Sequence, residues 1–420
     1  MIDSKLILTN KKHVKAELSK KGYDIEFIDA IEKLMLEVRR QKTRIDELNK
    51  KRNEINRDDK VSSEEKRRLR KQITNSEKDL KALEMHTQSH LLNVPNLPDS
   101  SAPIGDSESH NVIIDKSTEH YTCKVKNPLP HWEIADNLDI WDSSASSKVS
   151  GHGFSMFKGK GAKLLRSLVN YSFMLNEDNY TELLPPHLVN SAALTFTGHL
   201  PEFYDQQYKC HSDDLWLIPT AEVPLTAAYA ETTFTADMLP ECAMGYSLSF
   251  RRETGASGRD TRGLQRLHEF HKVELFKIVE PETVDAELSG MLEDCLRIIK
   301  DLNLQYRVVD LCTAEMGNKY ARCYDIEVYS PGIKKWLEVS SVGHFSDYQS
   351  RRSGIRYIDK NGKNKFAYTM NGSAIATPRV WLAIIETYQQ ADGTVKVPDV
   401  LVPFMGCEVI DKPRSSRLNP

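Results

Sequence analysis

The longest regular pattern of hydrophobic and polar positions lies between residues 24 and 92, where the chain contains no Pro or Gly. Single Leu, Ile and Val residues recur there at steps of three and four among many charged residues, as on the seam of a coiled coil. Gln41 and Arg52 interrupt the first half of this seam. Its apolar positions are Ile31, Leu34, Val38, Ile45, Leu48, Ile55, Leu69, Ile73, Leu80 and Leu83. The pattern predicts two amphipathic helices of about 30 residues, each roughly 45 Å long.

A short polar break separates the two predicted helices at residues 57–63. Within it, Ser62 is followed three residues later by Glu65, which is the spacing of a capping box at the start of a helix. Two helices of similar length joined by so short a break are expected to fold back on each other. We therefore predict an antiparallel coiled-coil hairpin over about residues 27–92, called the arm below.

The charge of the arm differs from that of the rest of the chain. Lys and Arg number 57 and Asp and Glu 60 in the 420 residues, which gives a net charge of −3. Between Lys50 and Lys71, ten basic residues stand against five acidic ones, so this segment carries +5 and the remainder −8. A basic hairpin on an acidic body suits a phosphate backbone, and Arg67, Arg68 and Arg70 are candidate contacts. The alternative is a solvated hairpin that serves dimerisation or binds nothing.

A segment rich in Pro, Asn and Ser at residues 92–100 ends the helical pattern and predicts a domain boundary. We expect one domain at residues 1–100 and a second at residues 101–420, where strand-like and helix-like segments mix. Neither GxGxxG nor GxxxxGK[ST] occurs, so neither a Rossmann nor a P-loop nucleotide site is indicated. The absence of an 18-residue apolar run, of a signal-peptide pattern and of a CxxC pair favours a cytoplasmic protein without disulfides.

The candidate chemistry begins in residues 250–272, which combine Arg-x-Glu, a loop rich in Gly and Arg, and Arg-x-His-x-Phe. In a strand-loop-strand hairpin, Arg251 would pair with a phosphate through its planar fork. Glu253 would accept from an exocyclic amine, and Phe270 would offer a flat face to a purine. The segment resembles motif 2 of class II aminoacyl-tRNA synthetases, in detail that of the seryl-tRNA synthetases. The resemblance implies an ATP site that includes Arg251, Arg252, Glu253, Arg266 and Phe270.

Two acids are candidates for binding an amino acid. Glu222 stands between apolar residues, where a carboxylate is costly to bury unless it meets a cation. From the pattern alone, it is equally an acid at a loop edge. Its segment resembles the Thr-Ala-Glu loop of the family, and Glu274 is the second matching acid. Two carboxylates, one ammonium and one small hydroxyl fit serine. The resemblance implies that serine is bound by Thr220, Ala221, Glu222, Glu274, Asn371 and Ser373.

A third segment, residues 337–341, alternates apolar and polar residues and predicts a strand. A period of two places Glu338 and Ser340 on one face and Ser341 on the other, unless the strand bulges. Carboxylate and hydroxyl oxygens suit Mg²⁺. The resemblance makes Glu338 and Ser341 the metal ligands, and it adds to the ATP site Glu338, Val339, Ser340 and Ser341.

Arg379 is expected in the first turn of an apolar helix, where Pro378 is well placed. An unpaired Arg on an otherwise buried helix is unusual. The segment resembles motif 3, whose arginine holds the γ-phosphate of ATP, so Arg251 and Arg379 are the catalytic candidates. By pattern alone, residues 161–186 form a core helix and a strand. They resemble motif 1, through which class II enzymes dimerise, and they imply a homodimer.

The chain departs from the family pattern at three places. Val342-Gly343-His344 stands close to the substrate, where the family usually has Cys-Ser-Asn. Ala314-Glu315 replaces the common Gly-Asp, and Ala374 and Pro378 replace frequent glycines.

The chain is thus similar to bacterial and organellar seryl-tRNA synthetases over essentially its whole length. The resemblance implies an α+β fold, in which a long antiparallel coiled coil that holds tRNA-Ser precedes a class II catalytic domain built on an antiparallel β-sheet flanked by helices. It also implies a serine–tRNA ligase reaction, in which ATP and Mg²⁺ activate L-serine to seryl-adenylate and tRNA-Ser takes the seryl group. Two alternatives stay open. One is a paralogue that makes seryl-adenylate for antibiotic resistance or biosynthesis. The other is a non-catalytic RNA-binding relative, against which Arg251, Glu253, Glu338 and Arg379 argue.

Overall fold

The computed structural model describes residues 1–57, 61–254 and 263–412. The chain divides into two compact units, Met1–Leu97 and Pro98–Pro420. This division lies three residues before the boundary expected from the sequence. The turn of the arm at residues 58–60 and the Gly- and Arg-rich loop at residues 255–262 lie outside the described residues.

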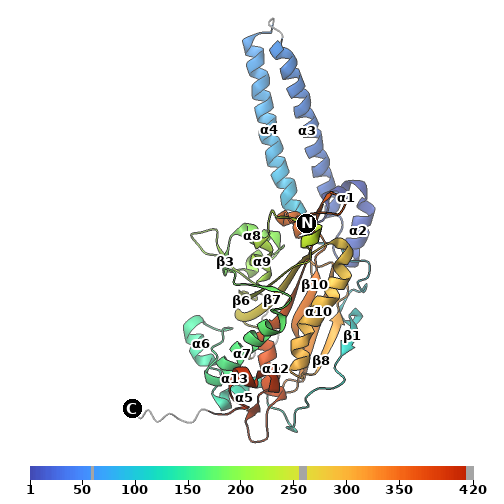
Figure 1. The fold of residues 1–420 in the computed structure, drawn as a ribbon. Coiled ribbons are helices and arrows are strands. Elements are labelled where there is room, and N and C mark those ends of the chain that lie inside the picture. The colour runs from blue at the N-terminus through green and yellow to red at the C-terminus, as the bar shows by residue number, and fades with distance from the viewer. Residues whose placement is uncertain (58–60, 255–262, 413–420) are drawn as a thin grey trace. The chain divides into compact units, whose positions relative to one another are not determined.

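The described part of the first unit contains four helices. The short helices α1 (Ser4–Thr9) and α2 (Lys11–Lys20) precede the long helices α3 (Phe27–Arg57) and α4 (Ser63–Leu91). The two long helices run side by side as an antiparallel pair (Figure 1), which confirms the predicted hairpin. The core of the unit at the start of α3 is made by side chains that are fully buried, namely Ile7, Val14, Leu18 and Ile28.

The seam between α3 and α4 contains the apolar positions of the heptad pattern. Ile31, Ile45, Leu69 and Ile73 are buried, and the other seam residues are half-buried. Ser62 accepts a hydrogen bond from the backbone N–H of Glu65 at 3.2 Å, which is the N-cap bond that the capping box predicts. Most of this hairpin is solvated, because one narrow stripe of each helix is all that it buries.

The second unit is built on an eight-stranded sheet with the strand order β1-β8-β9-β10-β13-β7-β6-β2. All neighbouring pairs are antiparallel except β2 and β6, which are parallel. The strands are β1 (Val112–Lys116), β8 (Tyr306–Asp310), β9 (Arg322–Ser330), β10 (Lys335–His344), β13 (Tyr368–Ala376), β7 (Glu269–Val279), β6 (Glu241–Phe250) and β2 (Thr181–Leu183).

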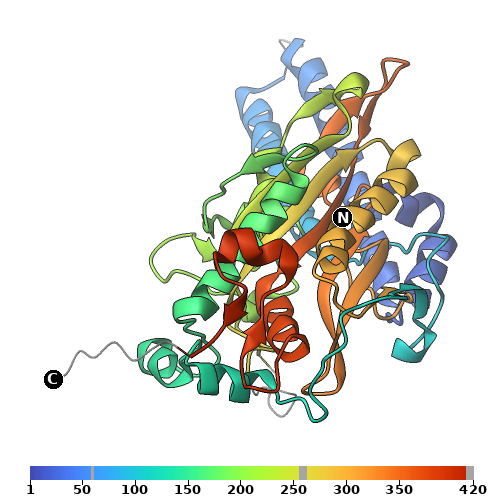
Figure 2. The same ribbon diagram turned by 60° about the horizontal axis from the view of Figure 1, so that its bottom comes forward.

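Three helices cover one face of this sheet (Figures 1 and 2) and share one hydrophobic core with it. They are α7 (Gly159–Asn176), α10 (Val284–Asp301) and α12 (Thr377–Thr387). Alternation along β7 sends Val273 and Leu275 into this core and Lys272 and Glu274 to the opposite face. The polar side chains of the central strands are therefore free to form a site on the face that these helices leave open.

Smaller elements surround the sheet. The helices are α5 (His131–Leu138), α6 (Ser143–Ser150), α8 (Ser191–Phe196), α9 (Glu222–Ala228), α11 (Ser350–Ser353) and α13 (Val402–Met405). Short 3₁₀ turns lie at Glu108–His110, Tyr204–Gln206, Ala236–Met238, Pro281–Thr283 and Asp399–Leu401. The minor sheets contain β5 (Thr233–Thr235), β11 (Arg356–Ile358), β12 (Asn364–Phe366), β3 (Leu188–Val189), β4 (Trp216–Leu217), β14 (Val395–Lys396) and β15 (Val409–Ile410).

None of the helices in the described ranges combines the length and the apolar character that a crossing of a lipid bilayer requires.

Candidate active site

Two adjoining pockets, of about 250 and 360 Å³, lie over the central strands of the large sheet. The first is lined by the nucleotide candidates Arg251, Glu253, Arg266, Phe270, Glu338, Val339, Ser340 and Arg379. The second is lined by the amino-acid candidates Thr220, Glu222, Glu274, Asn371 and Ser373, together with Ser341. The residues common to both linings are Arg251, Glu253, Lys272, Glu338 and Ser373. Segments far apart in the sequence thus meet at one continuous site.

Two of the residues predicted for the ATP and serine sites lie outside both linings. Ala221 is fully buried in a small core with Leu225 and Phe276. Arg252 is exposed, and its guanidinium lies 5.9 Å from the centre of the Tyr208 ring. Neither side chain contributes to the pockets in the described structure.

The wall between the two pockets carries Arg251. Its guanidinium lies 5.1 Å from the centre of the Phe270 ring, and its Nε donates to the carbonyl of Pro219 at 3.4 Å. Glu253, two residues on, is held in the left-handed region at φ +47° and pairs with Arg266 at 3.3 Å. A non-glycine residue in this region stores strain of order 1 kcal/mol or more, which is typical of functional sites.

Arg379 lies in the first turn of α12, directly after Pro378, as the sequence predicts. The expectation that it is unpaired is wrong. Its guanidinium donates to the carbonyl of Glu338 at 2.6 Å and to the carbonyl of Gln265 at 3.3 Å, and it lies 3.5 Å from the Glu338 carboxylate. These three contacts fix its position against β10 and against Gln265 of the motif 2 segment.

Strand β10 bulges at Val339, because its register with β9 shifts between Glu338 and Ser340. The bulge that the sequence left open as an alternative is therefore present, and it places Ser341 on the same side of β10 as Glu338. The Ser341 hydroxyl lies 3.3 Å from the Glu338 carboxylate. It also donates to Asp325 on β9 at 2.5 Å.

Asp325 is a neighbour of this pair that the sequence reasoning missed. Burial and the negative charge of Glu338 raise its pKa well above the ordinary value. Loss of hydration also raises the pKa of Glu338. The positive charges of Arg379 and Arg251 outweigh this effect, so the pKa of Glu338 is lower than its ordinary value. The Tyr-Asp-Ile-Glu-Val alternation of residues 324–328 was the signal, since it puts Asp325 on a polar strand face beside β10.

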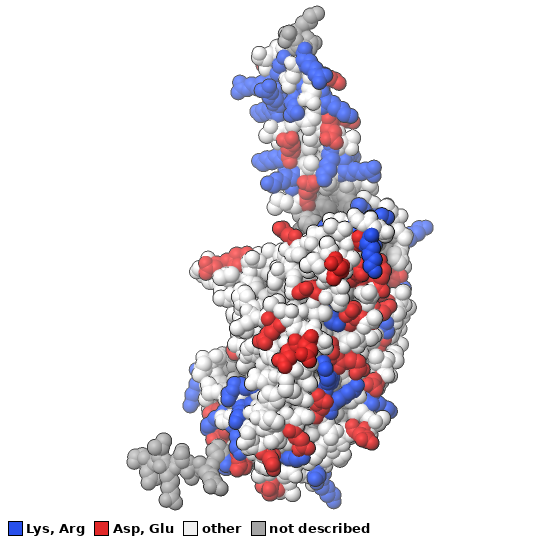
Figure 3. All heavy atoms as spheres, viewed as in Figure 1, with Lys and Arg blue, Asp and Glu red and all other residues white. Residues whose placement is uncertain are grey.

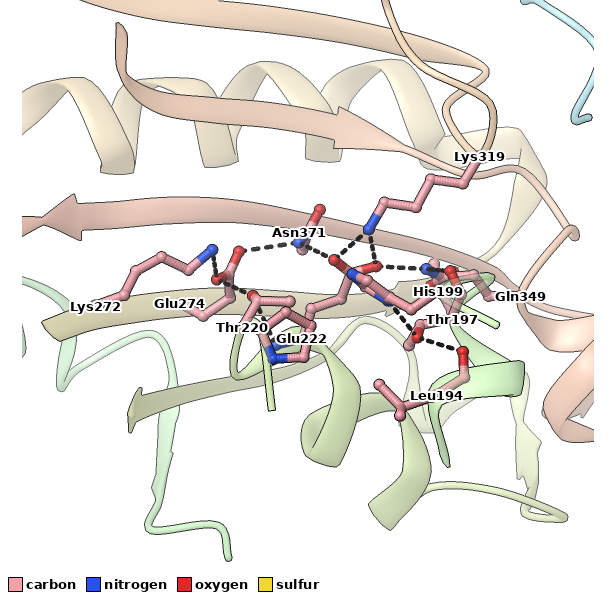
Figure 4. Close-up of polar contacts among 12 residues, drawn as sticks. Leu194, Thr197, His199, Thr220, Glu222, Lys272, Glu274, Lys319, Gln349 and Asn371 are labelled. Carbon is pink, nitrogen blue, oxygen red and sulfur yellow. Dashed lines mark hydrogen bonds and ion pairs between the residues drawn. The ribbon is translucent and has the colours of Figure 1, made fainter. Parts of the chain in front are cut away.

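In the second pocket, Glu274 is held by three neighbours (Figure 4). One carboxylate oxygen accepts from the Thr220 hydroxyl at 2.8 Å and pairs with the Lys272 ammonium, and the other accepts from the Asn371 amide at 2.9 Å. Glu274 and Asn371 are buried. Burial lowers the pKa of Lys272, and the carboxylate of Glu274 opposes this change.

Glu222, at the start of α9, is also buried, and each of its carboxylate oxygens accepts two hydrogen bonds (Figure 4). Lys319 donates to its two oxygens at 2.7 and 2.6 Å. Gln349 donates to one oxygen at 2.7 Å and Asn371 to the other at 3.1 Å. The sequence reasoning missed Lys319 altogether. It noted Gln349 within a family-like segment but gave it no role.

Family models match parts of both units of the chain. Residues 208–388 match the model of the tRNA synthetase class II core domain (G, H, P, S and T), and residues 1–98 match that of the seryl-tRNA synthetase N-terminal domain. The serine–tRNA ligase of Geobacillus kaustophilus is 41% identical over 419 residues, which cover 97% of this chain and 99% of that protein. That of Bacillus subtilis is 39% identical and covers 98% and 100%. The chain belongs to the seryl-tRNA synthetase family.

The solved structures extend this likeness to the fold. The seryl-tRNA synthetase from Pyrococcus horikoshii, determined in complex with ATP, is 31% identical to this chain and superposes with a TM-score of 0.91 over 99% of this chain and 100% of that one. The predicted fold class, a long helical hairpin followed by an antiparallel sheet flanked by helices, is therefore confirmed.

The family departure at residues 342–344 shapes the wall of the second pocket through Tyr320. A Cβ atom at Gly343 would lie 2.6 Å from the Tyr320 ring and 2.5 Å from the carbonyl oxygen of Arg322. The Tyr320 ring therefore occupies the space that a side chain at position 343 would need. Tyr320 lines the pocket beside Lys319. His344 is fully buried, and burial lowers its pKa to about 4.

A buried contact between α5 and α12 also reaches the first pocket, and the sequence reasoning missed it. The backbone N–H and ring Nδ1 of His131 both lie 2.8 Å from Glu386, and ring Nε2 accepts from the backbone N–H of Leu264 at 3.0 Å. Nδ1 therefore carries the proton. Ser330 and the N–H of Gly332 donate to the other oxygen of Glu386. The contact fixes the motif 2 segment at Leu264.

On the arm, Arg67, Arg68 and Arg70 are exposed, whereas Leu69 between them is buried in the seam. Figure 3 shows Lys and Arg side chains gathered along the helical pair. The segment that resembles motif 1 forms α7 and β2, and it is followed by Leu184, whose side chain is 80% exposed.

Proposed function

We propose that this protein is a serine–tRNA ligase that activates L-serine with ATP and transfers the seryl group to tRNA-Ser. The observation that carries the proposal is the meeting of the two pockets at Arg251, in a chain that belongs to the family over both of its units. An acid-rich pocket suits the amino acid, a pocket lined by arginines and an aromatic ring suits ATP, and the shared wall is where their reacting groups would come together.

In the first step, a carboxylate oxygen of serine attacks the α-phosphorus of ATP. A bond from this oxygen to phosphorus forms, the bond to the bridging oxygen breaks, and pyrophosphate leaves. No side chain need act as a nucleophile. We assign Arg251 to the α-phosphate, because it lines both pockets, and Arg379, which lines the first pocket, to the γ-phosphate, as its resemblance to motif 3 implies. Both neutralise charge that grows in the transition state.

The adenine would lie against Phe270, with Glu253 accepting from its amine. Thr220, Glu274, Asn371 and Ser373 would hold serine. A ligand without the hydroxyl would leave their buried polar groups unpaired, which favours serine over alanine.

Glu338 and Ser341 fit Mg²⁺ when ATP is bound. Their oxygens are hard donors on one face of β10, 3.3 Å apart, and the Asp325 carboxyl lies 2.5 Å from the Ser341 hydroxyl beside them. When bound, the ion would offset the charge of the phosphates. Glu338 and Ser341 would orient it, and Arg379 would hold the carbonyl and the carboxylate of Glu338 in place.

In the second step, a hydroxyl of the terminal adenosine of tRNA attacks the seryl carbonyl and AMP leaves. We assign the grip on tRNA-Ser to the arm, through Arg67, Arg68 and Arg70. We also propose a homodimer formed through the segment that resembles motif 1, where exposed Leu184 is followed by two prolines. Sedimentation equilibrium tests the dimer, because a protein of monomer mass at micromolar concentration would contradict it.

The test of function has two parts. Serine-dependent exchange between pyrophosphate and ATP reports adenylate formation, and charging of tRNA-Ser, with and without its long variable arm, reports transfer. We expect both activities, with charging reduced when the variable arm is absent. Exchange without charging would favour the adenylate-forming paralogue, and the loss of both would favour the non-catalytic relative.

A further inference from the structure

Lys319 occupies the place in the second pocket where a substrate ammonium would meet Glu222. Its Nζ lies 2.7 and 2.6 Å from the two carboxylate oxygens (Figure 4). Only 13% of the Lys319 side chain and 2% of the Glu222 side chain are exposed. The ammonium also lies 5.5 and 5.3 Å from the ring centres of Tyr320 and Phe345, within the range of cation–π attraction.

Glu222 has no acceptor capacity left. An ionised carboxylate offers about four lone-pair positions, and Glu222 accepts two contacts from Lys319, one from Gln349 and one from Asn371. An incoming ammonium can therefore bind Glu222 only if a present donor leaves. Gln349 and Asn371 are buried amides. Gln349 also contacts Thr369 and Asn371 also contacts Glu274, so these two donors are fixed on two sides.

Lys319 is the donor that can leave. Its four-carbon stem is flexible, and the side chain lines the open pocket beside the positive-φ turn at Gly317. Removing a lone cation would leave a buried carboxylate without a counter-charge, which is strongly destabilising. The exchange of one ammonium for another avoids this cost, because Glu222 stays paired before and after.

We propose that Lys319 is a specificity-determining internal competitor, whose ammonium holds Glu222 in the free enzyme and yields this place to the ammonium of serine. The inference rests on the proposed function. It makes Glu222 selective for ligands that bring their own ammonium. It also lowers the affinity for serine, since the competent form is only part of the free population.

Lys319→Met tests this, because Met has nearly the same length and no charge. We expect the melting temperature of the free variant to fall, since Glu222 loses its cation. Serine should bind to the variant about tenfold or more tightly in calorimetric titration, and its KM in pyrophosphate exchange should fall in parallel. 3-Hydroxypropanoate, which is serine without the amine, should show no such gain. Lys319→Arg keeps a cation and should show no gain in serine affinity.

Lys277→Met is the matched control. Lys277 is also a buried lysine that pairs with one carboxylate, Glu287, at 2.8 Å and lies over an aromatic ring, but outside both pockets. Its loss should lower the melting temperature without changing serine affinity.

Two results would overturn the proposal: serine binding to Lys319→Met that is no tighter than to the wild type, or an equal gain for 3-hydroxypropanoate. Wild-type exchange activity with serine would leave the proposed function standing in either case. If the wild type lacks that activity, the function fails, and the binding titrations still decide the role of Lys319.

Discussion

At the scale of single residues, the Arg251 side chain is expected to matter for catalysis and little for the stability of the fold. Its guanidinium lines both pockets and makes one long hydrogen bond, so its loss removes little of the core. We expect Arg251→Ala to lower serine-dependent pyrophosphate exchange by at least about 10²–10³-fold, while the melting temperature stays near that of the wild type.

Arg307→Ala is the control, since Arg307 also lies over an aromatic ring, Trp336, but outside the pockets. Near-normal exchange in Arg251→Ala would refute its assignment to the α-phosphate.

His344 predicts a dependence of stability on pH. Burial lowers its pKa from 6.5 to about 4, against Asp99 and Asp285, which raise it, and with Arg322, which lowers it. Between pH 6.5 and 4 the unfolded chain binds a proton at this residue that the folded chain does not. The free energy of unfolding is therefore unaffected by His344 above pH 6.5 and falls as the pH drops below it. The loss from this residue reaches ~3 kcal/mol near pH 4.

His344→Asn, which does not titrate, should remove this part of the loss. Denaturant unfolding between pH 7 and 4 measures it, with exposed His152→Asn as the control. Parallel curves for His344→Asn and the wild type would contradict the prediction.

The ion pair between Lys319 and Glu222 is a contact that the sequence alone does not predict. The argument that a carboxylate at position 222 needs a cation follows from the cost of burying charge. It does not say which cation, and in the described structure that cation is Lys319, nearly a hundred residues away. Long-range ion pairs of this kind leave no periodic trace in the sequence. The same holds for the contacts of Arg379, which local pattern suggested was unpaired.

At the scale of elements, the contact between His131 and Glu386 connects α5, α12 and Leu264 of the motif 2 segment. Glu386→Gln should disturb it, because either orientation of the amide turns an NH₂ group toward a backbone N–H. We expect a loss of about 2–4 kcal/mol in stability.

Because Gln265 and Arg266 of the first pocket follow Leu264 directly, we also expect the KM for ATP to rise by about tenfold, with little change in the KM for serine. Steady-state exchange kinetics measure both. Asp301→Asn, an acid on α10 that accepts from Tyr171, is the control and should leave both constants unchanged. A purely structural role would lower stability without moving the KM for ATP.

The bulge at Val339 belongs to the same scale. Strict alternation separates Glu338 from Ser341, and one extra residue in β10 brings them together. The sequence shows that a bulge would have this effect but contains no Gly or turn residue to locate one. Register is fixed by the pairing with β9, which local pattern does not specify.

At the scale of the whole molecule, the two units differ in how much the sequence predicts. The arm follows from a local rule. Apolar residues at steps of three and four form one stripe along each helix, and the two stripes pack against each other. The order of the eight strands does not, because neighbours such as β7 and β13 are about a hundred residues apart. For the second unit the motifs and their resemblance supplied the fold class, an antiparallel sheet flanked by helices, whereas the order of the strands was not predicted.

The arm also gives the prediction that spans both units. Deleting residues 30–90 should separate the half-reactions, because the second unit has its own core and holds both pockets. Serine-dependent exchange should persist, whereas charging of tRNA-Ser should collapse as phosphate contacts are lost. Charging by the intact protein should weaken steeply with salt, as the release of counterions requires.

Reversal of Arg67, Arg68 and Arg70 to Glu should mimic the deletion and leave the seam intact, because these side chains are exposed while Leu69 and Ile73 are buried. Reversal of the exposed Lys126, Lys360 and Lys363 changes the net charge equally in the second unit and serves as the control. The comparison separates a local grip on tRNA from general electrostatic attraction, since only a local grip depends on where the charges lie. The arm is not that grip if the arginine reversal charges tRNA-Ser normally at physiological salt, or if the deletion abolishes exchange as fully as charging.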